Sequence, residues 1–112
     1  MNPLAFTHLL VGLLMIALCR PLVRRKIKMN RWYGIRVPAA CESEERWLEI
    51  NEYGGRLLSR CGVVIAAVAV PEFFLGKAYW AAGALAGAAI MVVVLGLALW
   101  KIFHYARLTK KS

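Results

Sequence analysis

The longest stretch of this sequence without a charged side chain runs over residues 78–100. A helix of that length extends about 34 Å at 1.5 Å per residue, whereas the hydrocarbon core of a bilayer is about 30 Å thick. A stretch of this kind is typical of a transmembrane helix. The rest of the chain therefore has to fold around at least one membrane-spanning segment.

Two further segments are predicted to span. Residues 4–19 carry only Thr7 and His8 as hydrogen-bonding side chains and extend about 24 Å as a helix. Residues 57–75 have an apolar centre, and Pro71-Glu72 marks the start of their exit from the membrane. The composition agrees, because 61% of the chain is hydrophobic, against about 50% in soluble domains. We predict an all-α integral membrane protein with three transmembrane helices in one domain, residues 1–112.

The distribution of basic residues predicts the orientation. Residues 20–36 contain seven basic side chains and no acidic one, and the tail over residues 101–112 is also basic. Basic segments beside transmembrane helices stay in the cytoplasm. We therefore expect the N-terminus outside, residues 20–56 and the C-terminus inside, and Glu72 and Lys77 at the tip of an external hairpin. A cleaved signal peptide has the opposite charge order, so the first helix is expected to stay as an anchor.

Residues 28–55, the polar island, interrupt the apolar sequence. Gly34 and Pro38 predict an irregular loop, since Gly adopts backbone angles that other residues avoid and Pro lacks an N–H donor. Ser43 is a suitable N-cap for a following helix, and Glu44 and Glu45 suit the positive end of its dipole. The island therefore reads as a loop followed by a helix.

The helix predicted in the polar island is amphipathic, a connector on the cytoplasmic side. One face holds Trp47, Ile50, Asn51, Gly54 and Leu58. The opposite face holds Glu45, Arg46, Glu49, Glu52 and Arg56, in which Glu52 and Arg56 are spaced for an i,i+4 ion pair. Gly54-Gly55 predicts a hinge or a close-packing point before the next span.

Arg36 is the residue with the clearest binding chemistry. A guanidinium after a Gly turn can bind a phosphate or carboxylate through two hydrogen bonds, or it can bond backbone carbonyls and lock the loop. Trp47 and Asn51 could line a site with Arg36, or they could dock their helix onto the bundle. The sequence leaves both alternatives open.

Other polar or small residues inside the spans have simpler interpretations. His8 could relay protons or bind a ligand, but we expect a neutral histidine that a neighbouring helix satisfies. Gly83 and Gly87 form a GxxxG pair that permits close helix packing, within one subunit or in a homo-oligomer. A homo-oligomer is expected because three helices enclose little volume.

Several function classes find no support in the sequence. It has no catalytic motif, no phosphate-binding glycine loop and no acidic pair within a span, so we predict no enzyme and no cofactor. Cys19, Cys41 and Cys61 lack metal-ligand spacing, so we predict reduced thiols and no metal site. The net charge of +9 lies mostly beside apolar segments, which favours a lipid surface over nucleic acid.

The polar island also matches a known family pattern, N-x-x-x-G-I-R-x-P followed by S-E-x-x-W and a Gly-Gly pair. The matching residues are Asn30, Gly34, Ile35, Arg36, Pro38, Ser43, Glu44, Trp47, Asn51, Gly54 and Gly55. On these residues the chain resembles the SdpI family of bacterial integral membrane proteins. The arrangement of apolar segments around the island extends the resemblance over nearly the whole length.

This resemblance implies immunity to a secreted peptide toxin that attacks the bacterial envelope. For the best-known member it also implies signalling, in which the membrane protein captures a cytoplasmic repressor once toxin is present. The expected location is the bacterial cytoplasmic (inner) membrane, and the expected partners are membrane lipids, a peptide toxin and a repressor. The chain resembles the C-terminal module of the longer immunity proteins, which carry additional helices before it.

Two other hypotheses compete with immunity. In one, Arg36 holds an anionic headgroup or solute in a small transporter or lipid-binding membrane subunit. In the other, the chain is a structural scaffold of the membrane. The candidate binding or conformational residues are Asn30, Gly34, Arg36, Pro38, Trp47, Asn51, Gly54 and Gly55, and the candidate packing residues are Gly83 and Gly87.

Overall fold

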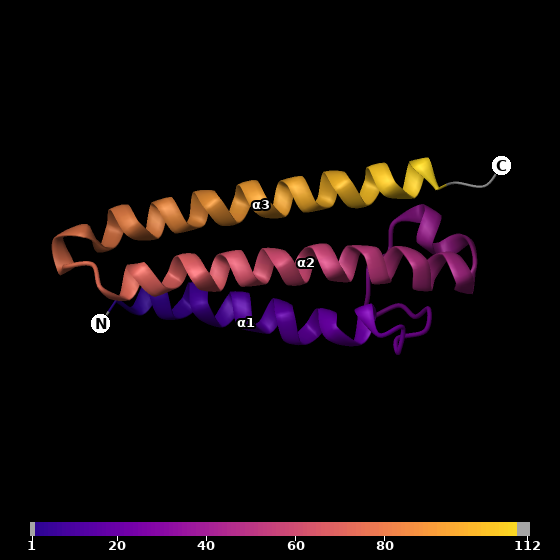
Figure 1. Cartoon of the computed structure of the whole chain (residues 1–112), viewed down its shortest axis with the longest axis horizontal. Coiled ribbons are helices and arrows are strands. Elements are labelled where there is room, and N and C mark those ends of the chain that lie inside the picture. The colour runs from indigo at the N-terminus through magenta and orange to yellow at the C-terminus, as the bar shows by residue number, and fades with distance from the viewer. Residues whose placement is uncertain (1, 110–112) are drawn as a thin grey trace.

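The computed structural model describes residues 2–109 and is built from three long helices that run side by side (Figure 1). They are α1 (Pro3–Val23), α2 (Glu44–Phe73) and α3 (Trp80–Leu108). The short 3-10 helices η1 (Pro38–Glu42) and η2 (Lys77–Tyr79) precede α2 and α3. Each long helix is apolar and long enough to cross a membrane, so this part of the predicted fold is confirmed. Which end faces the cytoplasm stays a prediction.

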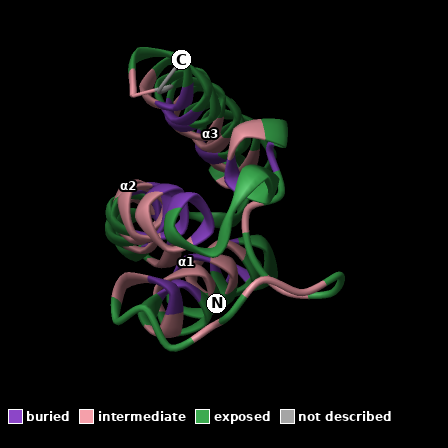
Figure 2. Cartoon of the chain, turned by 90° about the vertical axis from the view of Figure 1, so that its right-hand side faces the viewer, coloured by how far each residue is buried: buried purple, intermediate pink, exposed green. Residues whose placement is uncertain are grey.

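The bundle is long and thin, with extents of 55 × 23 × 19 Å. α2 packs against both α1 and α3, whereas α1 and α3 barely touch. Exposed residues cover much of the outside of the bundle in Figure 2, and many of them are large and apolar. Leu85 and Val92 of α3, for example, are 73% and 71% exposed. Such surface suits contact with lipid chains.

α1 and α2 lie in close contact at a pair of glycines, Gly12 and Gly62, that the sequence analysis did not single out. A Cβ atom on Gly12 would lie 2.6 Å from the carbonyl oxygen of Gly62. A Cβ atom on Gly62 would lie 2.6 Å from the carbonyl oxygen of Gly12. The two helix backbones therefore touch here, which is how small residues hold membrane helices together.

α2 corrects the prediction of a connector helix separate from the second span. One helix of 30 residues runs through the predicted connector and most of the predicted span over residues 57–75. Its start is as predicted, because the Ser43 hydroxyl accepts a hydrogen bond from the Arg46 amide at 3.1 Å. The predicted Glu52–Arg56 pair is also present, with Nη2 and Oε1 3.0 Å apart.

The hinge considered at Gly54-Gly55 is wrong, and the close-packing alternative describes the structure. A Cβ on Gly54 would collide with Ile35 of the loop, and a Cβ on Gly55 would lie 3.1 Å from Leu22 and 3.2 Å from Val23. Both glycines sit inside a continuous helix whose neighbours press on them. The loop packs against Gly54 and α1 packs against Gly55, and α2 continues without a break through both glycines.

α3 extends beyond the predicted span over residues 78–100. The residues predicted as the start of a basic tail continue the helix to Leu108, because Ile102 and Ala106 are buried against the polar island. The tail residues 110–112 lie outside the described part of the chain.

Glu72 lies in the last turn of α2, next to the predicted hairpin turn, but it is buried there. Its Oε1 lies 2.9 Å from Nδ1 of His8 on α1. Gly87 of α3 packs directly against this pair, and Gly83 packs against Leu75. The GxxxG pair thus packs within the subunit, and His8 has a partner on a neighbouring helix. The homo-oligomer stays a prediction.

Candidate functional site

The loop at the start of the polar island is folded by Asn30. Its Oδ1 accepts hydrogen bonds from the amides of Trp32 (2.8 Å) and Tyr33 (2.6 Å), and its Nδ2 donates to the Lys28 carbonyl at 2.7 Å. A short side chain that bonds the backbone two or three residues on is a common way to fix a tight turn. Asn30 therefore shapes this loop from within.

Gly34 follows in a conformation that only glycine adopts easily, with φ of 122°. The position also has no room for a side chain. A Cβ there would lie 2.6 Å from the ring of Trp47 and 2.9 Å from Oδ1 of Asn51. The loop backbone thus lies directly on α2.

Asn51 joins the loop to α2 through its side-chain amide. Oδ1 accepts from the Ile35 amide at 2.6 Å, while Nδ2 donates to the carbonyls of Ile35 (3.1 Å) and Trp47 (2.9 Å). The residue is only 1% exposed. Because one amide serves both backbone groups of Ile35, it fixes the register of the loop against the helix.

Trp47 is fully buried and bonds the same loop further back. Its Nε1 donates to the Ile27 carbonyl at 2.9 Å. It belongs to a core cluster that brings together η1, α2 and the end of α3. The buried members are Val37, Ala40, Trp47, Ile50, Ile102 and Ala106. Trp47 and Asn51 therefore dock their helix onto the loop, the second of the two roles considered for them.

Pro38 occupies the first position of η1 and is exposed. Pro suits that position because its fixed φ and missing N–H cost nothing in a first turn. It lines a cavity of about 480 Å³ between η1 and α3. The lining residues are Val37, Pro38, Ala39, Glu42, Phe103, Ala106 and Arg107. The cavity is mostly apolar, with one carboxylate and one guanidinium at its edge.

Arg36 contacts the backbone of its own loop, in line with the second of the two roles considered for it. Its side chain is exposed, and Nη1 donates to the Arg31 carbonyl at 3.2 Å. Within residues 2–109, no hydrogen bond joins Arg36 to Trp47 or Asn51. The structure therefore does not gather these three residues into one binding site. Arg36 and Trp32 are instead both exposed, Trp32 to 93%.

Arg46 is a residue that the sequence analysis placed wrongly, on the solvated face. It is 7% exposed, and it donates from Nη2 to the Ala106 carbonyl (3.0 Å) and from Nη1 to the Thr109 hydroxyl (2.9 Å). A cation is favourable at a helix C-terminus, where carbonyls lack partners. The error follows from the end of α3, since the added turns of that helix cover this face of α2.

Tyr33 and Tyr105 are two further contacts that the sequence did not reveal. The Tyr33 hydroxyl donates to the Leu18 carbonyl of α1, and burial raises the pKa of this phenol above its ordinary value. The Tyr105 ring stacks on Tyr53, and its hydroxyl donates to Glu49 at 3.0 Å. In a sequence, an aromatic residue among basic ones indicates only a position at the membrane–water interface. The hydrogen bonds of Tyr33 to Leu18 and of Tyr105 to Glu49 could therefore not be predicted.

The arrangement is thus a polar clamp, which we define as Asn30, Gly34, Trp47 and Asn51 with the backbone they hold. It fastens the loop to α2, and the core cluster fastens both to α3. Within residues 2–109, no group of three His, Cys, Asp or Glu side chains could hold a metal ion. The chemistry available on the surface is that of recognition, through Trp32, Arg36 and the cavity beside η1.

Comparison with protein-family models gives one match. The model described as the SdpI/YfhL protein family covers residues 26–102, which includes the polar clamp, all of α2 and most of α3. Comparisons with the curated proteins and with the solved structures give no match.

Proposed function

The chain belongs to the SdpI/YfhL protein family, and from this premise we propose that it gives immunity to, or signals the presence of, a membrane-active peptide toxin. It is a multi-pass membrane protein, and we place it in the bacterial cytoplasmic membrane with the polar island inside. A toxin would meet its apolar helices within the bilayer. A partner such as a repressor would meet the polar island.

The observation that carries this proposal is the continuity of α2. One helix of 30 residues reaches from the buried His8–Glu72 pair to the polar clamp. Because no hinge separates its two halves, a change in how α1 or α3 packs within the membrane would move the loop that the clamp holds. Packed elements with two discrete arrangements are how such shifts are transmitted.

The surface available to a partner lies on the loop and beside η1. Trp32 is almost fully exposed, which is unusual for a large aromatic residue outside an interaction surface. Arg36 uses one of its five N–H donors within the described chain. The cavity beside η1 adds an apolar recess of a size that can take side chains of a peptide.

The experiment measures survival and membrane potential of bacteria challenged with a panel of envelope-active peptides. Cells express the wild type, the double variant Trp32→Ala/Arg36→Ala, or the matched control Phe74→Ala/Lys77→Ala, at equal membrane levels. The control removes one exposed aromatic and one cation from the opposite end of the bundle. We expect protection by the wild type and the control, and its loss in the loop variant.

Failure of the wild type to protect against any peptide of the panel would refute immunity. Signalling is measured separately, as binding of a cytoplasmic repressor to the polar island. It predicts binding only when toxin is present. Equal protection by all three forms would remove the loop from the mechanism.

A second candidate function is a lipid-binding or anionic-solute-binding membrane subunit, or a small transporter, that uses Arg36. The exposed guanidinium of Arg36, with a single carbonyl contact, supports it. Native mass spectrometry would then show a bound anion or lipid that is lost in Arg36→Ala while the protein stays folded. The homo-oligomer, predicted from the small residues of α3, would be visible in the same spectra.

A further inference from the structure

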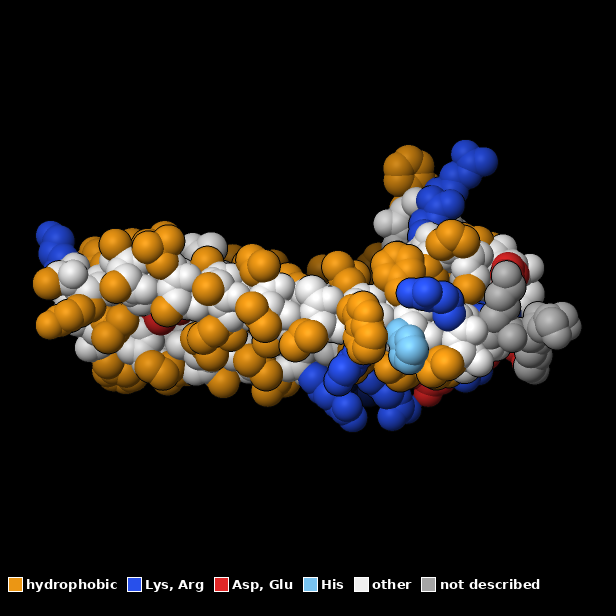
Figure 3. Space-filling view, turned by 90° about the horizontal axis from the view of Figure 1, so that it is seen from above, with side chains coloured by type: hydrophobic (Ala, Val, Ile, Leu, Met, Phe, Trp, Pro, Cys, Tyr) orange, Lys and Arg blue, Asp and Glu red, His pale blue; other side chains and the backbone are white. Residues whose placement is uncertain are grey.

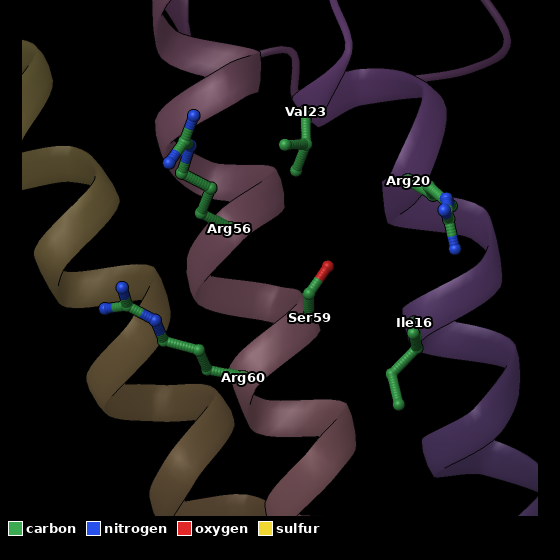
Figure 4. Close-up of a pocket in the computed structure, with 6 residues that line it drawn as sticks. All are labelled: Ile16, Arg20, Val23, Arg56, Ser59 and Arg60. Atoms are coloured by element: carbon green, nitrogen blue, oxygen red, sulfur yellow. The ribbon is translucent and has the colours of Figure 1, made fainter.

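A groove between α1 and α2 holds a cavity of about 300 Å³. The α1 residues of the lining are four and three positions apart, and on α2 Ser59 and Arg60 follow Arg56 by three and four positions, so each wall is one helix face. Figure 4 shows the two walls, with the Ser59 hydroxyl of α2 pointing toward α1. The lining residues are Ile16, Arg20, Val23, Arg56, Ser59 and Arg60.

The three arginines of this groove differ in their partners. Arg56 donates to Glu52 at 3.0 Å, and Arg25 bonds the same carboxylate at 2.7 Å. Within residues 2–109, the guanidinium groups of Arg20 and Arg60 have neither a carboxylate nor another hydrogen-bond acceptor. The groove therefore presents two uncompensated positive charges.

These charges lie where the apolar surface ends. Arg20 directly follows the apolar run over residues 4–19 of α1, and Arg60 directly precedes the apolar run over residues 61–70 of α2. Figure 3 shows lysine and arginine side chains gathered beside the apolar part of the bundle. Long basic side chains near the ends of membrane helices extend to the interface with the lipid headgroups. Lipid phosphates lie at that depth and accept guanidinium hydrogen bonds in a bidentate manner.

We propose that this groove binds the phosphate group of an acidic phospholipid between Arg20, Ser59 and Arg60. Ser59 lies between the walls and can donate its hydroxyl proton to the phosphate. Ile16 lines the end of the groove toward the apolar part of α1, where the acyl chains of the lipid would continue.

The proposal requires side-chain movement on both walls of the groove. Figure 4 shows the Arg20 guanidinium lying over α1 and not directed toward α2. Figure 4 shows the Arg56 and Arg60 side chains extended past α2 on the side of α3, away from the α1 wall. Arg60 is exposed and has no partner to release, so its long side chain can turn toward the groove. Arg56 stays on Glu52 and adds charge at the rim.

The test is native mass spectrometry of the full chain, released from micelles that contain phosphatidylglycerol or, in a parallel sample, phosphatidylcholine with the same acyl chains. We expect the wild type to retain one phosphatidylglycerol in preference to phosphatidylcholine. Arg20→Gln/Arg60→Gln should lower the affinity at least about tenfold, since each lost contact is a charge-assisted hydrogen bond. Arg20→Lys/Arg60→Lys should keep part of it.

The matched control is Arg31→Gln/Arg107→Gln, which removes the same charge from exposed positions outside the groove. It should retain the lipid as the wild type does, and an equal loss would overturn the proposal. Helix content and unfolding temperature in lipid-free detergent report whether each variant folds. Ser59→Ala gives an independent check through a few-fold loss of affinity, because it removes one hydroxyl and no charge.

Inorganic phosphate separates a lipid from a soluble anion. If phosphate raises the unfolding temperature as much as phosphatidylglycerol does, the groove is a site for a soluble anion and the lipid assignment is wrong. The site uses neither Arg36 nor the loop. Arg36→Ala in the same assay therefore tests the second candidate function separately, and the immunity assay is unaffected by either result.

Discussion

At one end of α2, Asn51 and Trp47 make four hydrogen bonds to backbone groups. At the other end, Glu72 has a single side-chain partner, His8. The two ends belong to the same helix and are both buried, but they differ in how much hydrogen bonding the neighbouring backbone requires from side chains. The loop has an irregular backbone whose N–H and C=O groups need partners from elsewhere, whereas the membrane helices satisfy their own backbone.

The comparison explains why the conspicuous residues of the polar island are structural. Asn30, Gly34, Trp47 and Asn51 hold the loop, whereas Arg36, Trp32 and the cavity beside η1 remain accessible for recognition. The membrane end needs few polar residues, so the hydrogen-bonded pair of His8 and Glu72 stands out there. The predictions below test whether stability follows this difference.

The largest effect is expected for Asn51→Ala. It removes three hydrogen bonds and leaves both backbone groups of Ile35 without their partner, so the free energy of unfolding should fall by about 3 kcal/mol. Equilibrium unfolding in mixed micelles measures the change. A loss smaller than that caused by breaking the His8–Glu72 pair would reverse the comparison.

Gly34→Ala should follow, with a loss of about 2 kcal/mol, because the new Cβ meets Trp47 and alanine is strained at this φ. Gly76→Ala is the matched control, since a Cβ there meets no atom within 4 Å. Unfolding temperatures of the two variants, measured side by side, should differ clearly. Equal temperatures would show that the loop yields to the added methyl group.

A smaller effect is expected at the membrane end. A double-mutant cycle with His8→Leu and Glu72→Leu should give a coupling free energy of about 1 kcal/mol, since interactions between membrane helices are typically weak. Thermal unfolding of the four proteins in one detergent supplies the cycle. A coupling free energy of zero would mean that the contact between His8 and Glu72 does not stabilise the fold.

The smallest effect is expected for the exposed pair of Arg25 and Glu52, 2.7 Å apart. Arg25→Gln should cost about 0.5 kcal/mol and less at high salt, because exposed ion pairs are screened. Comparing unfolding at low and high ionic strength checks this. A salt-independent loss would instead show that the effect of the substitution does not come from the ion pair.

Local sequence patterns were sufficient for some elements of the structure. Ser43 as an N-cap, the Glu52–Arg56 pair and the buried face with Trp47 and Asn51 all follow from the spacing of residues on one helix. The same patterns failed where a second element mattered. The burial of Glu72 beside the hairpin was not predicted, because it depends on His8, a partner 64 residues away in sequence.

The sequence by itself determined three apolar helices and the family, because hydrophobic length and a fixed order of residues are local properties. Only the tertiary structure decided that α2 is unbroken, that Arg46 caps α3, and that Arg20 and Arg60 lie beside one groove. The physical reason is that each of these depends on which distant atoms lie nearby to fill a space, accept a hydrogen bond or leave a charge uncompensated. Spacing along one helix does not contain that information.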